Sequence, residues 1–285
     1  MKLYIHCDGG FGNRYNVLLS GLYLADHAGL EPKIIWNSNN WCGATFAELF
    51  DCQLPVEPFD YRTFFQQHNT TNIIHENQFH QPMVSYQPNS FSLNALKSFI
   101  HYQGRDVFYF TNLIPGWVNK TELLLKVVPQ VPFRTDIVQI AESVIAKNVL
   151  EQTFNGIHMR KTDFGNSINE QDYHNLIKQS PETKFFICSD DYETEKRFLQ
   201  HKNVFGYNKT SYVEKLIEGG WNTNIIDNNN NAWPFNVNRP SDSVIQALVD
   251  LIVLSHSNII NTNLRSTFLQ TALLLKESRS VQTTF

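Results

Sequence analysis

The sequence predicts an α/β protein made of two Rossmann-like halves that face each other across a cleft, and three observations support this prediction. Residues 2–36 follow a strand, turn, helix, strand order, which is typical of the opening of a parallel sheet covered by helices. From residue 135 onward, apolar strands again alternate with amphipathic helices. The run Pro129-Gln130-Val131-Pro132 separates the two patterns. We therefore expect an N-terminal domain over 1–132 and a C-terminal domain over 133–285.

In the first half, the turn between strand and helix is rich in glycine. The expected elements are a strand at 2–7, the turn at 8–13, a helix from about 14 to 27 and a strand at 33–36. Apolar residues recur on one face of that helix, and Gly29 is expected to end it. The stretch 41–128 is aromatic and mixed, with candidate strands at 107–111 and 123–128.

The second half shows the clearer alternation. The expected elements are a helix capped by Thr135 or Asp136 and running to about 149, a strand at 154–159, a helix near 170–179, a strand at 184–188, a helix at 192–201, a helix at 241–256, a strand at 258–261 and a last helix that opens at 265–268. The polar low-complexity run 227–231 is expected to be a loop.

Composition limits the class of function. The chain has 285 residues, 42% of them hydrophobic and 18% charged, which is typical of a folded globular protein. Its net charge is −4 without a sustained Lys/Arg run, which argues against nucleic acid or an anionic membrane as the main partner. No apolar run approaches the roughly 18 residues of a transmembrane segment, although peripheral association with a membrane stays open. Four cysteines without metal-type spacing favour reduced thiols and a cytoplasmic location.

The turn Gly10-Phe11-Gly12-Asn13-Arg14 invites a dinucleotide-binding interpretation, which the sequence does not support. A G-x-G-x-x-G pattern would require glycine at Tyr15, and Trp36-Asn37 stands where an acidic residue would end the second strand. The N–H groups at the start of the following helix could still hold an anion such as a sugar pyrophosphate, with Arg14 beside it. The alternative is a turn that only packs the helix against the strand.

The strand that ends in His158-Met159-Arg160-Lys161-Thr162-Asp163 is the most informative stretch of the chain. It places a planar cation and a carboxylate at the carboxyl edge of a sheet, where open α/β sheets bind ligands. The rigid donor fork of Arg160 suits phosphate oxygens. The alternative is a structural ion pair at the end of a strand.

Three further polar positions follow or interrupt apolar segments. Asp190-Asp191 follows a strand but lacks the Asp-x-Asp spacing of a diphosphate-bound metal, so helix capping is the alternative and no metal site is expected. Ser266-Thr267 opens the last helix and can either bind phosphate or cap the helix. Asp250 lies in a helix that is apolar on most sides, where a carboxylate is costly unless paired. A buried carboxylate there could accept two N–H donors from a base such as guanine.

With these segments in order, the chain resembles the fucosyltransferase superfamily that has the two-domain GT-B fold. This superfamily includes the core, the nodulation-factor and the protein O-fucosyltransferases. Three segments carry the resemblance, and their order covers nearly the whole chain: Gly9–Arg14, His158–Asp163 and the stretch from Asp250 to Phe268.

The resemblance implies a role for each of these residues. Arg160 would hold the β-phosphate of GDP-fucose and offset the charge on the departing GDP. His158 and Asp250 would contact the guanine base. Ser266, Thr267 and Phe268 would form the phosphate-binding helix start, and Asn13 and Arg14 would approach the pyrophosphate or the fucose from the N-terminal domain. Besides the residues that the resemblance implies, we expect Gly10, Gly12 and Asp190 to contribute to donor binding.

The same resemblance implies an inverting reaction in which an acceptor hydroxyl displaces GDP. Asp163 is the nearest carboxylate that could take the proton as a catalytic base, with Glu170 or Asp172 as alternatives. The sequence departs from the core-type enzymes here, since Phe164 replaces a lysine and Ile168 stands where they carry an acid.

We therefore expect a cytoplasmic, metal-independent glycosyltransferase that moves fucose from GDP-fucose to a glycan, with no cofactor besides this donor substrate. The C-terminal domain would bind the nucleotide sugar, and the N-terminal domain would bind the acceptor. Two alternatives stay open: the same fold with another GDP- or UDP-sugar, and a non-catalytic module that binds a glycan or a nucleotide. The sequence does not specify the acceptor, the linkage or the oligomeric state.

Overall fold

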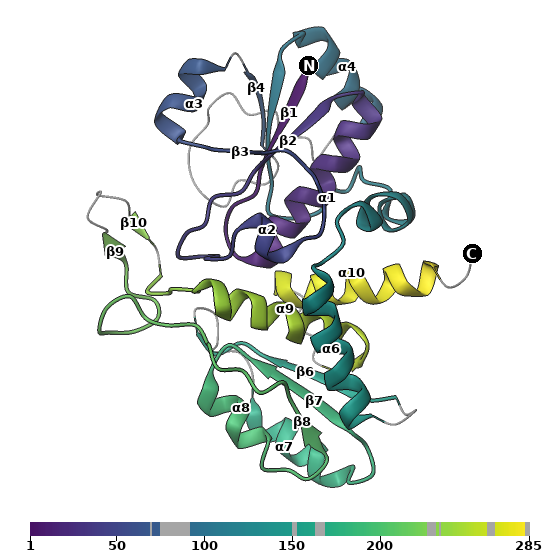
Figure 1. Cartoon of the computed structure of the whole chain (residues 1–285), viewed down its shortest axis with the longest axis vertical. Coiled ribbons are helices and arrows are strands. Elements are labelled where there is room, and N and C mark those ends of the chain that lie inside the picture. Colours follow the sequence, from purple (N-terminus) through teal and green to yellow (C-terminus); the bar gives the residue numbers. More distant parts are fainter. Residues whose placement is uncertain are drawn as a thin grey trace. The chain divides into compact units, whose positions relative to one another are not determined.

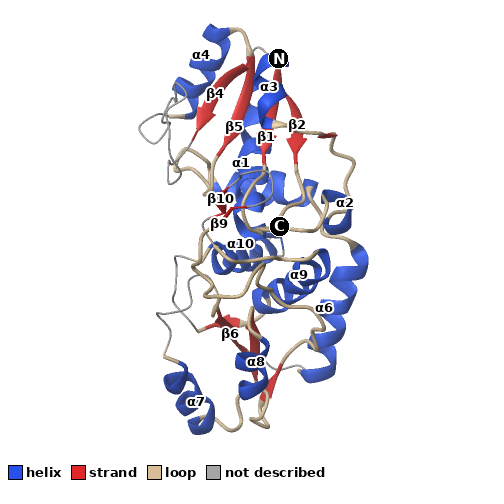
Figure 2. Cartoon of the chain, turned by 90° about the vertical axis from the view of Figure 1, so that its left-hand side faces the viewer, coloured by secondary structure: helices blue, strands red, loops and turns tan. Residues whose placement is uncertain are grey.

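The fold consists of two compact units, each built on a parallel sheet with helices against it (Figures 1 and 2). The computed structural model describes residues 1–68, 70–74, 92–149, 153–162, 169–226, 232–233, 235–260 and 266–282. Unit 1 comprises Met1–Asn37, Thr45–Pro132 and Glu277–Phe285, and unit 2 comprises Ser38–Ala44 and Phe133–Lys276. The prediction of an α/β protein with parallel sheets is confirmed.

The sheet of unit 1 has five parallel strands in the order β3-β2-β1-β5-β4. The strands are β1 (Lys2–His6), β2 (Glu31–Ile35), β3 (Val56–Glu57), β4 (Thr70–Ile74) and β5 (Asp106–Phe110). Its helical segments are α1 (Phe11–Ala28), α2 (Phe46–Leu49), α3 (Tyr61–Gln67), α4 (Leu93–Gln103), α5 (Lys120–Glu122), the π-helix η2 (Leu123–Val127) and the 3₁₀ helix η3 (Val128–Gln130).

Helix α1 packs against β1 and is buried over most of its length. It begins at Phe11, earlier than the sequence indicated, directly after the turn in which Gly9 has a φ of 80°. Gly29 ends it in the left-handed conformation, as predicted. Gly21 allows the close packing, because a Cβ there would lie 2.7 Å from the side chain of Ile5.

The predicted strand at 123–128 is wrong, because this stretch is helical in η2 and η3. Leu123, Leu124 and Val127 are buried, whereas Leu125 is exposed, so the apolar side chains share one helical face. A short apolar run does not distinguish a buried strand from a buried helix by its periodicity alone.

The main sheet of unit 2 has four parallel strands in the order β11-β6-β7-β8. The strands are β6 (Asn155–Met159), β7 (Phe185–Ser189), β8 (Val204–Phe205) and β11 (Asn258–Ile259), and a separate antiparallel pair joins β9 (Ile225–Ile226) to β10 (Ala232–Trp233). The helices are α6 (Thr135–Asn148), α7 (Glu170–Gln179), α8 (Tyr192–Phe198), α9 (Ser241–Ser255) and α10 (Thr267–Gln282), whose last residues are grouped with unit 1.

The central strands of this sheet carry apolar side chains into the core. A cluster of fully buried residues holds α7 and α8 against β6 and β7: Ile157, Met159, Ile177, Phe185, Ile187 and Phe198. Gly156 is required by close packing, since a Cβ there would lie 2.0 Å from Ser257 Oγ. Strand β7 is buried at every position and reads as a nearly continuous apolar run, which is why the sequence located it well.

Helix α6 starts at Thr135, earlier than expected, so the cap position is Arg134 rather than Thr135 or Asp136. The guanidinium of Arg134 instead donates two hydrogen bonds to the Asp136 carboxylate, at 2.9 and 2.8 Å. The loop predicted at 227–231 lies outside the described residues. Within the described ranges, no helix combines the length and the apolar character that crossing a membrane requires.

Candidate functional site

The carboxyl edge of the unit 2 sheet gathers most of the predicted site residues. Strand β6 pairs with β7 so that Met159 lies opposite Ser189. Arg160 and Asp190, the next residue of each chain segment, therefore leave the sheet side by side. This edge is where open α/β sheets bind ligands.

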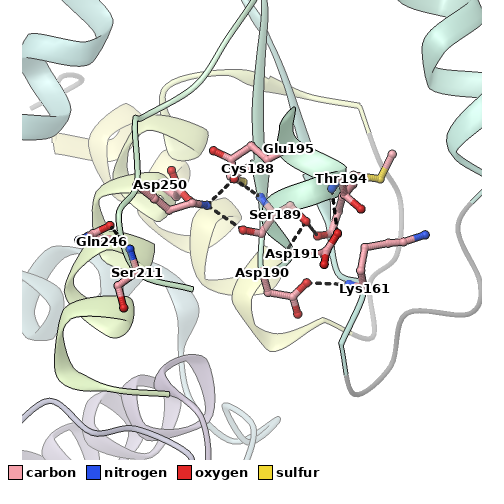
Figure 3. A network of polar contacts seen from close by, with 12 residues as sticks. Lys161, Cys188, Ser189, Asp190, Asp191, Thr194, Glu195, Ser211, Gln246 and Asp250 are labelled. Carbon is pink, nitrogen blue, oxygen red and sulfur yellow. Dashed lines mark hydrogen bonds and ion pairs between the residues drawn. The ribbon is translucent and has the colours of Figure 1, made fainter. Parts of the chain in front are cut away.

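Asp190 holds the backbone that follows Arg160 (Figure 3). Its Oδ1 accepts a hydrogen bond from the Lys161 N–H at 2.7 Å, and its Oδ2 accepts one from the Thr162 hydroxyl at 2.6 Å. On the other side of Arg160, the Ser189 hydroxyl donates to the Met159 carbonyl at 2.8 Å. The chain is thus fixed before and after Arg160, which is itself partly exposed.

The two acids after β7 have different tasks. Asp191 caps α8, because its Oδ2 accepts a hydrogen bond from the Thr194 N–H at 2.8 Å. Asp190 is directed at the β6 exit instead. Among the residues that the structure describes, no group of three or more His, Cys, Asp or Glu side chains is placed to hold a metal ion.

Of the three carboxylates considered as a base, Asp163 lies outside the described residues, as do Phe164 and Ile168. Glu170 is held by two cations, with its Oε1 2.6 Å from Lys161 Nζ and its Oε2 2.9 Å from Arg197 Nη2. Burial acts to raise the pKa of Glu170, but these two cations outweigh it and lower the pKa below its usual value. A carboxylate stabilised in this way is a poor proton acceptor. The third candidate, Asp172, is exposed.

His158 connects β6 to the start of α10. Its ring stacks on Phe268, with the ring centroids 4.8 Å apart and an interplanar angle of 24°. Burial lowers the pKa of His158 to about 3, and the nearby charges of Arg160 and Lys209 act in the same direction. The imidazole is therefore neutral at physiological pH.

Ser266 precedes α10 and is buried, whereas Thr267 and Phe268 are partly exposed. The Ser266 hydroxyl is 3.4 Å from the Leu269 N–H, a long distance for a helix cap. Both of the roles predicted for Ser266, capping and anion binding, remain compatible with this geometry.

Asp250 belongs to a buried charge cluster that ties together four segments of unit 2 (Figure 3). Lys209, in the segment after β8, places its Nζ 2.5 Å from Asp250 Oδ2, 2.6 Å from Glu195 Oε2 and 2.7 Å from the Ser189 carbonyl oxygen. The side chains of Lys209, Glu195 and Asp250 are 3%, 1% and 3% exposed. An ammonium group has three N–H donors, so these three acceptors use it completely.

Each carboxylate of this cluster keeps one buried oxygen without a hydrogen-bond partner among the described residues, Asp250 Oδ1 and Glu195 Oε1. A buried acceptor left without a donor costs roughly 1–3 kcal/mol, and more when the group is charged. Burial raises the pKa of both carboxylates, with Lys209 opposing it. Burial also disfavours the charge on Lys209, but Asp250 and Glu195 outweigh it and raise the pKa of the ammonium.

Sequence reasoning did not identify Lys209 or Glu195. The available signal was indirect: a buried Asp250 needs a cationic partner, but nothing in the local pattern says which lysine supplies it. Lys209 is 41 positions away along the chain.

The glycine-rich turn of unit 1 is organised around Arg14, whose side chain is 0% exposed. Its Nε donates to the Gly9 carbonyl at 2.7 Å, and its Nη1 donates to the Asn37 carbonyl at 2.8 Å. The guanidinium also lies 3.7 Å from Asp8 Oδ1 and over the ring of Trp36. Arg14 thus joins the turn to the exit of β2.

The predicted donor-binding residues of unit 1 surround this turn. Gly10 is the residue before α1 and makes no side-chain cap, Gly12 is buried, and Asn13 has a buried Oδ1 without a hydrogen-bond partner among the described residues. The predicted residues of unit 2 form a separate group: His158, Arg160, Asp190, Asp250, Ser266, Thr267 and Phe268.

Solved structures match this fold, whereas no protein-family model and no curated protein matches the chain. NodZ alpha-1,6-fucosyltransferase co-crystallised with GDP matches with a TM-score of 0.57 and 14% identity, over 96% of this chain and 91% of that one. Fucosyltransferase NodZ from Bradyrhizobium matches with a TM-score of 0.55 and 13% identity, over 96% and 92%. POFUT1 in complex with GDP-fucose matches with a TM-score of 0.53 and 10% identity, over 97% and 95%. At these identities the likeness shows the fold alone, and at that level the predicted resemblance to fucosyltransferases is confirmed.

Proposed function

We propose that this chain is an inverting, metal-independent glycosyltransferase that moves fucose from GDP-fucose to a hydroxyl group of a glycan. The observation that carries the proposal is the exit of β6, where Arg160 lies at the carboxyl edge of the unit 2 sheet between backbone segments held by Ser189 and Asp190. The match to fucosyltransferase structures, some of them with GDP or GDP-fucose, supports this donor.

In this proposal, unit 2 binds the nucleotide sugar. Arg160 contacts the β-phosphate, because its planar donor fork suits phosphate oxygens and its backbone is already positioned. The start of α10 at Ser266 and Thr267 offers N–H groups to the same diphosphate. Asp250 accepts N–H donors from guanine, while neutral His158 and Phe268 line the same edge of the sheet.

The reaction breaks the bond between the anomeric carbon of fucose and the β-phosphate oxygen, and GDP leaves with that electron pair. The acceptor oxygen forms the new bond from the opposite side and loses its proton, for which Asp163 is the proposed base. Arg160 and the backbone donors offset the charge that develops on GDP, an effect that in enzymes is worth several kcal/mol.

The wider architecture of the proposal is a GT-B enzyme in which the N-terminal domain, 1–132, carries the acceptor and the C-terminal domain, 133–285, carries the donor. Gly10, Gly12 and Asn13 approach the pyrophosphate or the fucose, with Arg14 supporting their turn from inside. The four cysteines are all described and form no disulfide, which is compatible with a cytoplasmic location.

Calorimetric binding of GDP, GDP-fucose, UDP and NAD, with and without EDTA, tests the proposal. We expect GDP and GDP-fucose to bind more tightly than UDP or NAD, with affinities unchanged by EDTA. Loss of binding in EDTA would contradict the metal-free mechanism, and a preference for UDP would favour another sugar donor. Binding without turnover on any glycan acceptor would favour the non-catalytic alternative.

A further inference from the structure

The carboxyl edge of the unit 1 sheet carries a histidine that the roles proposed so far do not use. His6 is the last residue of β1, and its ring lies against the rings of Phe59, Phe108 and Phe110. Open α/β sheets bind ligands at this edge. We infer that His6, Phe59 and Phe110 form a subsite for one pyranose ring of the acceptor glycan, with the imidazole bound to a sugar hydroxyl. This inference deepens the proposed function and rests on it for the identity of the glycan as the acceptor.

Strand pairing places His6 beside Phe110. Tyr4 of β1 lies opposite Phe108 of β5 in the parallel register, so the next pair on the same face of the sheet is His6 with Phe110. The centroid of the His6 ring lies 5.5 Å from that of Phe110 and 4.6 Å from that of Phe59. Tyr4 and Phe108 are buried, whereas His6, Phe59 and Phe110 are partly exposed. This face of the sheet is therefore closed in its middle, and its aromatic side chains reach solvent at the carboxyl end.

The imidazole of His6 makes no hydrogen bond to another residue within the described part of the chain. His68 lies near the same face and differs, because its Nδ1 is 3.1 Å from the Tyr4 hydroxyl. A polar ring among apolar side chains costs free energy unless its nitrogens meet water or a ligand. Packing alone would be served equally well by a phenylalanine at position 6, so the nitrogens are the feature that a ligand would explain.

The chemistry of this cluster suits a sugar ring. Burial lowers the pKa of His6 to about 4, with Asp8 opposing this shift and Arg14 adding to it. The imidazole is therefore neutral at physiological pH, so that one nitrogen donates and the other accepts. A hydroxyl group also donates and accepts, whereas an anion only accepts. The phenylalanine rings add an apolar surface against which the C–H groups on one face of a pyranose can pack.

Titration of the isotope-labelled wild-type protein with methyl glycosides of glucose, galactose, mannose and N-acetylglucosamine, followed by NMR, is the first measurement. We expect at least one glycoside to shift the imidazole signals of His6 and the amide signals of Phe59 and Phe110. The Kd should lie in the millimolar range, because a single sugar ring buries little surface. Sorbitol, which carries similar hydroxyl groups without a ring, should cause no shift. Equal shifts with sorbitol, or no shift with any glycoside, would overturn the inference.

The variant His6→Phe separates the hydrogen bond from the packing, since it keeps an aromatic ring in the cluster and removes both nitrogens. The glycoside that binds the wild-type protein most tightly should bind this variant about tenfold more weakly. His68→Phe is the matched control, because it removes an imidazole that is already bonded to Tyr4, and it should keep the wild-type affinity. Unchanged affinity in His6→Phe, or an equal loss in both variants, would contradict the inference. If His6→Phe does not fold by circular dichroism, the wild-type titration still decides the question.

The subsite and the proposed function fail separately, because the glycoside titration contains no nucleotide. Tight binding of GDP by calorimetry, together with no response of His6 to any glycoside, would remove the subsite and leave the proposed transferase intact. Binding of a glycoside at His6 without binding of GDP would support the subsite. It would also favour the non-catalytic glycan-binding module over the transferase.

Discussion

The exits of β1 and β6 are comparable positions in the two units, and each is followed by an arginine that the sequence assigned to a phosphate. At the β1 exit, Arg14 is 0% exposed and its guanidinium is bound by backbone carbonyls of Gly9 and Asn37. At the β6 exit, Arg160 is partly exposed, and hydrogen bonds from the β7 exit fix its chain neighbours on both sides. The side chain of Arg14 holds its own turn together, whereas the backbone on both sides of Arg160 is held by other residues.

We expect burial, rather than residue type, to separate the two roles. A guanidinium enclosed by carbonyl groups stabilises the fold, and its removal leaves those acceptors unpaired. A guanidinium on a rigid segment at a sheet edge can bind an anion without loss of structure. The predictions below test this division, and the largest expected effect comes first.

Arg160→Ala should abolish most turnover with GDP-fucose, by about 10²–10³-fold, because a positioned cation that offsets leaving-group charge is lost. The melting temperature should stay within a few degrees of the wild-type value, since the segment is held by other residues. Arg105→Ala, at an exposed position, serves as the control and should keep full turnover. Wild-type rates in Arg160→Ala would refute the catalytic role.

Arg14→Ala should mainly affect stability, with a loss on the order of 3 kcal/mol in the free energy of unfolding measured with urea. The reason is that the carbonyl groups of Gly9 and Asn37 lose a buried donor and Trp36 loses one of its packing partners. Arg134→Ala is the matched control, since Arg134 is 40% exposed and its pair with Asp136 should contribute less than about 1 kcal/mol. Equal stability losses in the two variants would remove the contrast between buried and exposed arginines.

The histidines near the two exits should make stability depend on pH. Burial lowers the pKa of His158 to about 3 and that of His6 to about 4. Because the folded-state pKa is lowered, each histidine binds a proton in the unfolded chain at a higher pH than in the folded protein. The free energy of unfolding that its neutral form contributes is therefore complete above about pH 6.5, and it falls as the pH drops toward the folded-state pKa. Between pH 7.5 and 5.0, wild-type protein should lose about 2 kcal/mol more unfolding free energy than His158→Asn.

Urea unfolding of both proteins at the two pH values measures this difference. The comparison with the variant is needed because Asp250 and Glu195, whose pKa values are raised, shift stability in the opposite direction. Parallel pH profiles for wild type and His158→Asn would show that His158 is not held neutral.

Asp190→Asn should lower kcat about tenfold with little change in KM for GDP-fucose. The carboxylate accepts hydrogen bonds from both Lys161 and Thr162, whereas the single amide oxygen of asparagine can replace only one of its two oxygens. Asp191→Asn is the adjacent control, since asparagine is an equally good helix cap. Steady-state kinetics of the two variants distinguishes a positioning role from helix capping. A matching drop in both variants would contradict a specific positioning role for Asp190.

Much of the α/β order could be predicted from local pattern, since 170–179 forms α7 with the predicted bounds and 154–159 lies within one residue of β6. Apolar strands that lie between turn residues, and helices with one apolar face, can each be recognised from the pattern of a few residues. The π-helix at Leu123–Val127 was missed because a short apolar run carries no clear period.

The sequence by itself determined the alternation of strands and helices, the polar residues after β6 and β7, and the need of a buried acid at 250 for a partner. Only the tertiary structure decided that this partner is Lys209, that Asp190 serves the neighbouring strand exit, and that Arg14 is enclosed. The physical reason is that periodicity reports which face of an element is buried, whereas hydrogen bonds between distant segments depend on how the strands align. The sequence shows that a buried carboxylate needs a hydrogen-bond donor, and the fold determines which residue supplies it.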